Sequence, residues 1–340
     1  MTAAISSRIS AVHPLWAVEG GRVTIEGSDL PVEPSLPRVT IGGLPARLTA
    51  ARPTELTAIV PSGLEGGHTA IRIEEFAGET AYVEIGTPLA TGLHQVDSPA
   101  VDGMGNVYVT FSGSRGQQGP VAVFVVRPDG SRAPFVADLA NPTSLAFGPD
   151  GALHVSSRFD GSVHRVDASG TVSVVATDLG VACGIAFSED GTLFVGDRSG
   201  SILRVRDGRA TIFASIPPSV AAFHLAFGPD GWLYVTGPTL AARDCVYRVS
   251  PEGDVQIFHD GFGRPQGLAF DSHGDLYVVD AIAGASGLYR LRLDRPSEAE
   301  QVMSGGSPIG LAFHPDGGFV LASTDTVYRF SRSPAARRPA

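Results

Sequence analysis

A segment of 40 to 46 residues occurs in six consecutive copies, and this repeat restricts the possible fold more than any other feature of the chain. The copies begin with "SPAVDGMGNVYVTF" at Ser98, "SLAFGPDGALHVSS" at Ser144, "GIAFSEDGTLFVGD" at Gly184, "HLAFGPDGWLYVTG" at His224, "GLAFDSHGDLYVVD" at Gly267 and "GLAFHPDGGFVLAS" at Gly310. Each copy has two apolar runs joined by a turn with glycine, which tolerates the left-handed backbone of a tight hairpin. A second strand pair follows, such as "GSVHRVDASGTVSVVA" at 161–176. Four short strands in each of six such repeats predict a six-bladed β-propeller.

The last repeat is incomplete, and the chain before the first repeat can complete it. The sixth copy ends after "TVYRFSRS" without a fourth strand. Upstream, "TPLATGLHQVDSPAV" at 87–101 matches "APFVADLANPTSLAF" at 133–147 position by position. We therefore expect residues 87–91 to form the outer strand of the last blade, which closes the ring and covers an otherwise open strand edge.

Residues 1–86 have a different pattern, with short alternating strands between Gly- and Pro-containing turns, as in a small β-sandwich. The phrases "GGRVTIEGSDL", "VTIGG" and "VPSGLEGG" resemble the IPT/TIG immunoglobulin-like family over almost the whole region. Such modules mostly act as spacers or docking surfaces, so the resemblance implies a fold rather than an activity. We expect an all-β protein with a sandwich over 1–86, a propeller over 87–331 and a disordered tail over 332–340.

Charge and composition exclude some classes of partner. The 340-residue chain has a formal net charge of −10, which argues against binding to nucleic acid or to an anionic membrane. The N-terminus lacks the pattern of a signal peptide, and no apolar stretch approaches the ~20 residues that span a bilayer. The two cysteines, Cys183 and Cys245, cannot form a disulfide framework. We therefore expect a cytoplasmic protein, and the sequence leaves its oligomeric state open.

Aligning the repeats identifies the residues around the central channel, where the inner strands of a propeller begin. Asp97, Thr143, Cys183, Phe223, Gln266 and Ile309 head the six inner strands. One step further along come Ser98, Ser144, Gly184, His224, Gly267 and Gly310, which are mostly small, as crowding near the axis requires. Asp97, Thr143, Cys183, Phe223 and Gln266 are therefore candidate ligand contacts.

Residues 87–331 resemble the NHL-repeat and senescence-marker/gluconolactonase group of six-bladed propellers, which includes lactonases with one divalent cation in the channel. The metal ligands of those enzymes fall on Asp97 of "DSP", Thr143 of "TSL", Cys183 of "CGI" and Gln266 of "PQG". Calcium needs six to eight oxygen ligands, several of them carboxylates, and only one of these four residues is an acid. The resemblance thus implies the fold but only a degenerate metal site, in which Ca, Mn or Zn would depend on Asp97.

Cys183 and His224 head neighbouring repeats and allow two interpretations. In one, His224 activates a Cys183 thiolate as a catalytic nucleophile. In the other, which we favour, Cys183 is a small buried hydrophobe and His224 packs between blades against a backbone carbonyl, because adjacent residues of a strand point to opposite faces.

Arg158, Arg198 and Asp280 lie in loops expected at the channel mouth. Arginines there can hold a polar or carboxylate-bearing ligand through paired hydrogen bonds. The alternative is that these side chains form surface ion pairs and bind turn amides, as Asp often does at the end of a strand.

Two functions fit these observations. The first is a non-catalytic recognition protein that binds a small polar molecule, a glycan or a protein at the channel mouth. The alternative is a lactonase-like hydrolase or lyase that uses Asp97 and a divalent cation. Whether the protein is an enzyme stays open at this point, and Asp97, Cys183 and His224 are the candidate catalytic residues.

Overall fold

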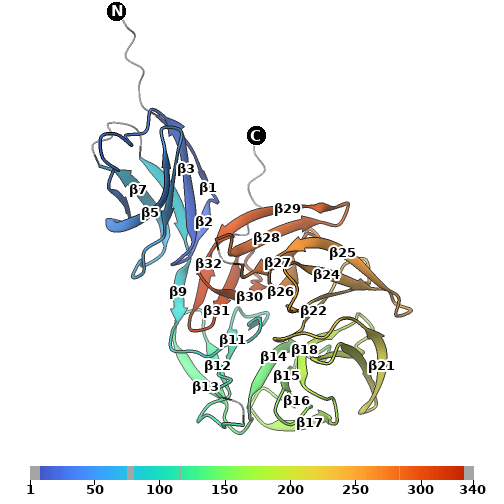
Figure 1. Ribbon diagram of the computed structural model, residues 1–340. Helices are drawn as coiled ribbons and strands as arrows, with labels where there is room; N and C mark the ends of the chain where they lie inside the picture. The colour runs from blue at the N-terminus through green and yellow to red at the C-terminus, as the bar shows by residue number, and fades with distance from the viewer. Residues whose placement is uncertain (1–7, 75–79, 115, 283, 333–340) are drawn as a thin grey trace, which may run out of the picture. The chain divides into compact units, whose positions relative to one another are not determined.

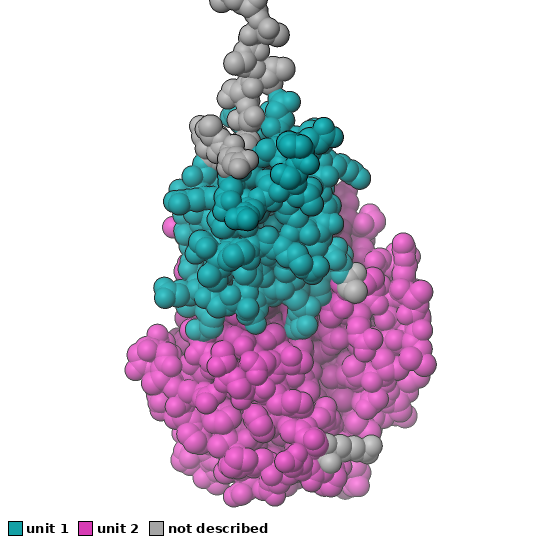
Figure 2. All heavy atoms as spheres, turned by 60° about the vertical axis from the view of Figure 1, so that its left-hand side comes forward, with its two compact units in different colours: residues 1–88, 283–288, 301–307 teal, residues 89–282, 289–300, 308–340 magenta. Residues whose placement is uncertain are grey.

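A computed structural model describes residues 8–74, 80–114, 116–282 and 284–332 (Figure 1). Strands are the only regular elements in these residues, which confirms the all-β prediction, and none of them contains a helix long and apolar enough to cross a membrane. The chain divides into a unit of residues 1–88, 283–288 and 301–307 and a unit of residues 89–282, 289–300 and 308–340 (Figure 2). From residue 333 on, the tail predicted to be disordered lies outside the described residues.

The first unit is built on two layers of strands linked by one long strand. Its strands are β1 (Arg8–His13), β2 (Trp16–Ala17), β3 (Arg22–Ser28), β4 (Val39–Ile41), β5 (Leu44–Arg52), β6 (Glu55–Ile59), β7 (Gly67–Ile73) and β8 (Ala81–Ile85). They pair in the order β1-β3-β6-β5-β4-β7-β8-β2, and β5 pairs with β4 through its first residues and with β6 through the rest.

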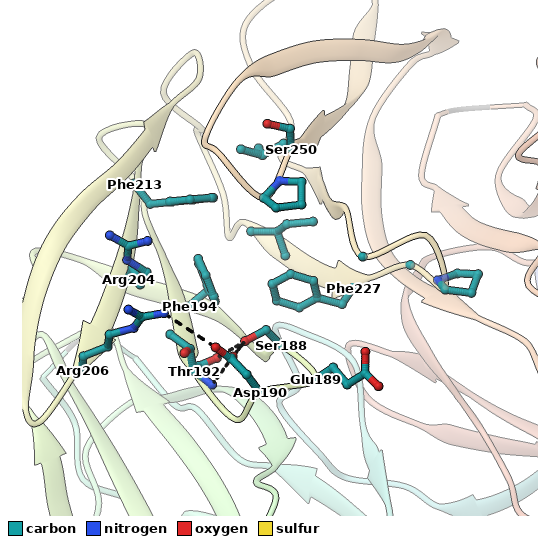
Figure 3. Close-up of a pocket in the computed structure, with 16 residues that line it drawn as sticks. Ser188, Glu189, Asp190, Thr192, Phe194, Arg204, Arg206, Phe213, Phe227 and Ser250 are labelled. Atoms are coloured by element: carbon teal, nitrogen blue, oxygen red, sulfur yellow. Dashed lines mark hydrogen bonds and ion pairs between the residues drawn. The ribbon is translucent and has the colours of Figure 1, made fainter.

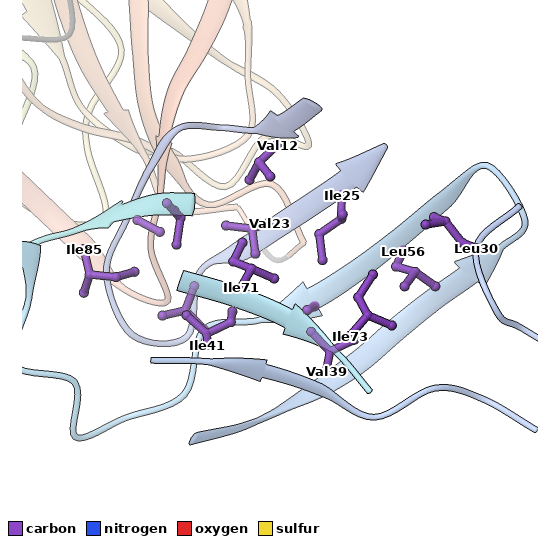
Figure 4. Packing of buried hydrophobic residues seen from close by; sticks show 14 residues of the cluster. Val12, Val23, Ile25, Leu30, Val39, Ile41, Leu56, Ile71, Ile73 and Ile85 are labelled. Atoms are coloured by element: carbon purple, nitrogen blue, oxygen red, sulfur yellow. The ribbon is translucent and has the colours of Figure 1, made fainter. Parts of the chain in front are cut away.

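Alternation of apolar and polar residues along these strands produces the core of the first unit. Val23 and Ile25 of β3 and Ile71 and Ile73 of β7 are buried in this core (Figure 4). Arg22, which precedes Val23, and Arg72, which lies between the two isoleucines of β7, are exposed. Burial of each such side chain contributes about 1.5–3 kcal/mol, and the predicted sandwich core forms in this way.

The repeats form four-stranded antiparallel sheets around a common centre (Figure 1). The first four repeats give the strands β10 (Ala100–Val101), β11 (Val107–Thr110), β12 (Val123–Val126) and β13 (Arg132–Val136); β14 (Pro142–Phe147), β15 (Leu153–Ser157), β16 (Ser162–Val166) and β17 (Val172–Ala176); β18 (Ala182–Phe187), β19 (Leu193–Asp197), β20 (Ser201–Arg206) and β21 (Arg209–Ser215); and β22 (His224–Phe227), β23 (Leu233–Thr236), β24 (Asp244–Val249) and β25 (Val255–Phe262). The chain therefore contains a β-propeller.

The last sheet is closed by a strand from far upstream. It consists of β30 (Pro308–Phe313), β31 (Phe319–Ser323), β32 (Val327–Phe330) and β9 (Thr87–Ala90), in that order. The outer strand that the sixth repeat lacks thus comes from the residues expected to supply it.

The fifth repeat departs from the expected six separate sheets. Its strands β26 (Pro265–Phe270), β27 (Leu276–Asp280), β28 (Gly287–Arg292) and β29 (Arg295–Ser304) pair in sequence, but they belong to a 12-stranded sheet. The cause is the length of β29, whose residues Met303 and Ser304 pair in parallel with Trp16 and Ala17 of β2. Five separate four-stranded sheets are present, and the prediction of six is corrected accordingly.

A recurring aromatic contact joins neighbouring sheets and explains the phenylalanine that ends "LAF". An aromatic ring on the second strand of one repeat meets the phenylalanine on the first strand of the next, with centroids 4.8–5.5 Å apart and an edge-on geometry. The pairs are Tyr108–Phe147, His154–Phe187, Phe194–Phe227, Tyr234–Phe270 and Tyr277–Phe313. Such a pair contributes about 0.5–1.5 kcal/mol beyond burial, so the motif fixes the spacing of the inner strands.

Candidate functional site

The inner strands of all six repeats surround one cavity of about 400 Å³ on the propeller axis. It runs from Asp97 and His224 to Phe187, Phe270 and Phe313, the last residues of β18, β26 and β30. Its other lining residues are Ser98, Pro99, Ser144, Leu145, Ala146, Ile185, Ala186, Leu225, Leu268, Ala269, Leu311 and Ala312. The cavity therefore extends toward the hairpin turns of the inner strands, and its polar side chains, Asp97, Ser98, Ser144 and His224, lie near the other end.

The inner strands are tightly packed at that polar end. A Cβ atom on Gly267 would lie 2.5 Å from Cα of Gly310, and one on Gly310 would lie 2.5 Å from Cα of Ser98. Ser98 Oγ accepts a hydrogen bond from the Leu311 amide at 3.3 Å and so links the first and sixth inner strands. The small residues predicted at these positions are thus required by direct contact between the strands.

His224 is the one large side chain in this layer, and it pairs with Asp97. The imidazole Nδ1 donates to Asp97 Oδ1, which also accepts the Ser98 amide at 2.5 Å. Only 2% of the His224 side chain and 4% of the Asp97 side chain is exposed. The expectation that His224 bonds a backbone carbonyl between blades is therefore wrong, because the first and fourth inner strands are close enough for a direct contact.

The second ring nitrogen of His224 has no hydrogen-bond partner among the described residues, although it is buried. With Nδ1 as the donor to Asp97, Nε2 carries a lone pair in the neutral ring and an N–H in the protonated ring. A buried polar group without a partner is unusual in a folded protein and often marks a position that a water or ligand occupies. The pair thus fixes the orientation of an imidazole that lines the axial cavity and whose Nε2 has no partner among the described residues.

Cys183 lies in the hydrophobic cluster between the third and fourth repeats and is 1% exposed. Burial, together with a smaller effect of the nearby Asp97 carboxylate, raises the pKa of its thiol to about 12. The thiol stays protonated at neutral pH, so the thiolate nucleophile of the catalytic interpretation does not form. Cys183 has the role of a small buried hydrophobe.

The other residues at the heads of the inner strands differ in accessibility. Thr143 is buried and donates to the Asn141 carbonyl at 3.1 Å, and Phe223 is buried in the same cluster as Cys183. Gln266 is partly exposed, and its carbonyl accepts a hydrogen bond from Thr236 Oγ1 at 2.5 Å. None of these three residues lines the axial cavity, and Gln266 is the one of them that is partly exposed.

Arg158 and Arg198 lie near the same end as Cys183, since both guanidinium charges lower the pKa of its thiol, although burial dominates that pKa. Each hydrogen-bonds a backbone carbonyl, Arg158 that of Gly113 at 3.5 Å and Arg198 that of Val220 at 3.0 Å. Neither arginine lines the axial cavity. The cavity therefore lies toward the opposite face from the loops that were predicted to hold a ligand.

Asp280 is buried at the end of β27 and accepts the amides of Gly263 and Arg264 at 3.0 and 2.6 Å. Burial raises the pKa of this carboxyl group, while the two amide hydrogen bonds oppose the increase. Asp197, at the same position of β19, accepts the Val181 amide at 2.8 Å. These aspartates hold the loops between repeats, as in the turn-binding interpretation.

The donor groups do not fit a divalent cation. Within the described ranges, no three His, Cys, Asp or Glu side chains lie together in a way that could hold a metal ion. The one acid of the ring, Asp97, already accepts from His224 and Ser98. A cation at this position would have to displace both donors and would find no second carboxylate, so no step is derived through a metal.

The geometry of the described residues defines a class of protein, a β-propeller that follows an immunoglobulin-like domain. The IPT/TIG domain model matches residues 7–74, so the N-terminal domain is of this type. No curated protein matches the sequence.

Several solved structures are similar to this chain at low sequence identity. An auxiliary nutrient binding protein from Bacteroides thetaiotaomicron matches with a TM-score of 0.55 and 12% identity, over 95% of this chain and 97% of that one. A putative gluconolactonase matches with a TM-score of 0.59 and 17% identity, over 71% of this chain and 90% of that one. A catalytically inactive His-to-Ala variant of virginiamycin B lyase from Staphylococcus aureus, with quinupristin, matches with a TM-score of 0.54 and 15% identity, over 91% of this chain and 98% of that one. Similarity at this level establishes the fold and leaves the function to the site.

Proposed function

We propose that the protein binds a small polar molecule, such as a sugar or a sugar acid, in the axial cavity beside His224. The observation that carries this proposal is that His224 lines a cavity of about 400 Å³ and that its buried Nε2 has no hydrogen-bond partner among the described residues. A volume of this size lies in the range of about 300–1,000 Å³ that is usual for small-molecule sites. The proposal counts β26–β29 as a sixth blade, because β26 contributes cavity residues in the same way as the other inner strands.

Two of the similar structures agree with this class of ligand. One is described as an auxiliary nutrient binding protein and another as a putative gluconolactonase. A hydroxyl-rich ligand can donate a hydrogen bond to His224 Nε2 while its ring faces the apolar walls at Leu225 and Leu268. The channel-mouth site predicted around Gln266, Arg158 and Arg198 stays a prediction for a larger partner, such as a glycan or a protein.

Calorimetric titration with glucose, gluconate and glucono-1,5-lactone tests the proposal. His224→Gln removes the imidazole Nε2 and keeps an amide that can donate to Asp97. His259→Gln is the matched control, because His259 is also buried but lies outside the cavity and packs against Phe262, which does not line it. We expect at least one probe to bind the unchanged protein and the control equally and the His224→Gln variant about tenfold or more weakly. Equal binding to both variants, or no binding of any probe, would contradict the proposal.

A second candidate function is a hydrolase or lyase with His224 as the general base. The supporting observation is that Asp97 fixes Nδ1 as the donor and leaves Nε2 to accept a proton. Incubation with glucono-1,5-lactone and with quinupristin, followed by mass spectrometry, separates this function from binding alone. Turnover that His224→Gln abolishes and His259→Gln retains supports catalysis, whereas binding without turnover supports the first proposal.

A further inference from the structure

A second and larger cavity, of about 820 Å³, lies between the sheets of the third and fourth repeats (Figure 3). It opens near the hairpin turns that precede β19 and β23 and is separate in its lining from the axial cavity. Arg204 and Arg206 of β20 lie on one side of it, and Phe227 lies across from them (Figure 3). The sequence analysis did not identify this site, although one signal for it is present in the repeats.

The signal is an arginine at the same position on the third strand of five repeats. The five are Arg165, Arg204, Arg248, Arg290 and Arg329. The register of strand pairing confirms the equivalence for four of them, since each lies opposite the second residue of its neighbouring second strand. In the first repeat, Val125 takes this position opposite Tyr108.

In four of the five repeats the guanidinium group is held by an acceptor on a nearby side chain. Arg165 bonds Asp150 at 2.7 Å, Arg248 bonds Gln256 at 2.9 and 3.2 Å, Arg290 bonds Glu300 at 2.5 Å, and Arg329 bonds Asp316. The position thus normally serves to tie the third strand to a turn or to the outer strand of the same sheet.

Arg204 lacks such an acceptor. The acid of its own turn, Asp190, accepts from Ser188 Oγ at 2.5 Å and from the Thr192 amide at 3.1 Å, and it pairs with Arg206 at 3.6 Å. The Arg204 guanidinium lies 5.5 Å from the centre of the Phe213 ring and makes no hydrogen bond or ion pair with any other described side chain or carbonyl. Because an aromatic face uses none of the N–H donors, these donors stay available at the cavity wall.

The remaining walls are mostly apolar. Phe194 packs edge-on against Phe213 and Phe227, with centroids 5.0 and 5.2 Å apart, and Leu233 and Val249 are buried beside them. Glu189 and Asp190 line the same cavity as Arg204 and Arg206, so its acids and arginines balance; Asp190 pairs with Arg206, and the Arg204 guanidinium forms no ion pair with either acid. This combination suits one negative charge attached to an apolar body and disfavours a doubly charged phosphate.

We propose that this cavity binds an organic carboxylate with an aromatic or aliphatic body. The ligand's carboxylate takes the place beside Arg204 that the Asp150 carboxylate takes beside Arg165. The guanidinium group donates two parallel N–H···O bonds to it. The rings of Phe194, Phe213 and Phe227 pack against the body of the ligand. The third repeat thus carries a binding site where its neighbours carry an internal ion pair.

Ligand-detected NMR and calorimetry with indole-3-acetate test the proposal, and indole-3-acetamide serves as the uncharged probe of the same shape. The variants are Arg204→Gln and, as the matched control, Arg165→Gln at the equivalent position of the second repeat. We expect indole-3-acetate to bind the unchanged protein and Arg165→Gln with the same Kd and Arg204→Gln about tenfold or more weakly. Indole-3-acetamide should bind the unchanged protein about tenfold more weakly than the acid.

Three results would overturn the proposal: no binding of indole-3-acetate to the unchanged protein, an unchanged Kd in Arg204→Gln, or an equal loss in Arg165→Gln. Misfolding should not obscure the comparison, because the Arg204 guanidinium makes no hydrogen bond within the described chain and only stacks on Phe213, so that its replacement should change the melting temperature little. Arg204→Lys adds a second reading, since a lysine keeps the charge but not the paired geometry, so its Kd should lie between those of the unchanged protein and Arg204→Gln.

Discussion

Removing either member of the Asp97–His224 pair should strongly destabilise the propeller. Both side chains are at least 96% buried, and Asp97 Oδ1 accepts from both Nδ1 of His224 and the Ser98 amide. Asp97→Ala would leave those two donors without a partner in addition to Nε2 of His224. Breaking a buried pair by removing one partner typically costs about 3–5 kcal/mol, and we expect this loss for Asp97→Ala and a similar one for His224→Ala.

The two variants should not be additive, because each removes the same interaction. We expect the double variant to cost about as much as one single variant, which corresponds to a coupling energy of about 3–5 kcal/mol. Urea unfolding in a Trp16→Phe background provides the assay, since Trp232 then reports on the propeller alone. The difference between variants should change little between about 0.05 and 0.5 M salt, because buried pairs are poorly screened.

Losses below about 1 kcal/mol for both single variants would refute this reasoning, because they would show that solvent or local rearrangement satisfies the groups left behind. Additive losses in the double variant would refute it equally, since they would mean that the two residues stabilise the fold through separate contacts.

Three further predictions follow from single residues. Gly310→Ala should lower the free energy of unfolding in urea by about 1–3 kcal/mol, because the new Cβ would lie 2.5 Å from Cα of Ser98. A Cβ on Gly103 would meet nothing within 4 Å, so Gly103→Ala should change the free energy of unfolding by no more than about 0.5 kcal/mol, and equal effects of the two variants would contradict the crowding. Cys183, with its pKa raised to about 12 by burial, should resist iodoacetamide in the native protein near pH 8 and react in urea, as peptide mass spectrometry can show; rapid native labelling would contradict its burial. The pKa of Asp316 is lowered from 3.8 to about 2, because the hydrogen bond and charge of Arg329 outweigh the effect of partial burial. The stabilisation of the fold by this carboxylate is therefore present above about pH 4 and is lost as the pH falls toward 2, and it should be less than about 1 kcal/mol because the side chain is half exposed. Asp316→Asn should remove this part of the acid dependence, and an unchanged acid-unfolding profile would contradict the prediction.

The sequence predicted the strands well because each depends on neighbouring residues. The alternation within "SLAFGPDGALHV" and its glycine turn specify a hairpin wherever the segment occurs, and β14 and β15 follow it closely. The closing strand was also predictable, because residues 87–101 repeat the pattern of 133–147. The merger of the fifth repeat into a larger sheet was not, since it depends on where the end of β29 meets β2.

The candidate sites were harder to predict because their residues are distant in sequence. Asp97 and His224 are 127 positions apart, and only the width of the channel shows that an imidazole on the fourth inner strand can reach a carboxylate beside the first. Arg204 looked like the arginines of the other repeats. Arg204 differs because Asp190, the acid of its own turn, pairs with Arg206 instead. This pairing can be recognised only when the positions of the side chains are known.

The closing strand β9 has a consequence for the synthesis of the protein. Its last residue, Ala90, is translated 237 residues before Val327, the first residue of its partner β32 (327 − 90). At about 5–20 residues per second, β9 waits roughly 10–50 s on the ribosome before the strand that pairs with it exists. During that time its edge is open to wrong partners, so closure of the last sheet is necessarily a late event, and the growing chain depends on β9 remaining unpaired until its own C-terminal repeat emerges.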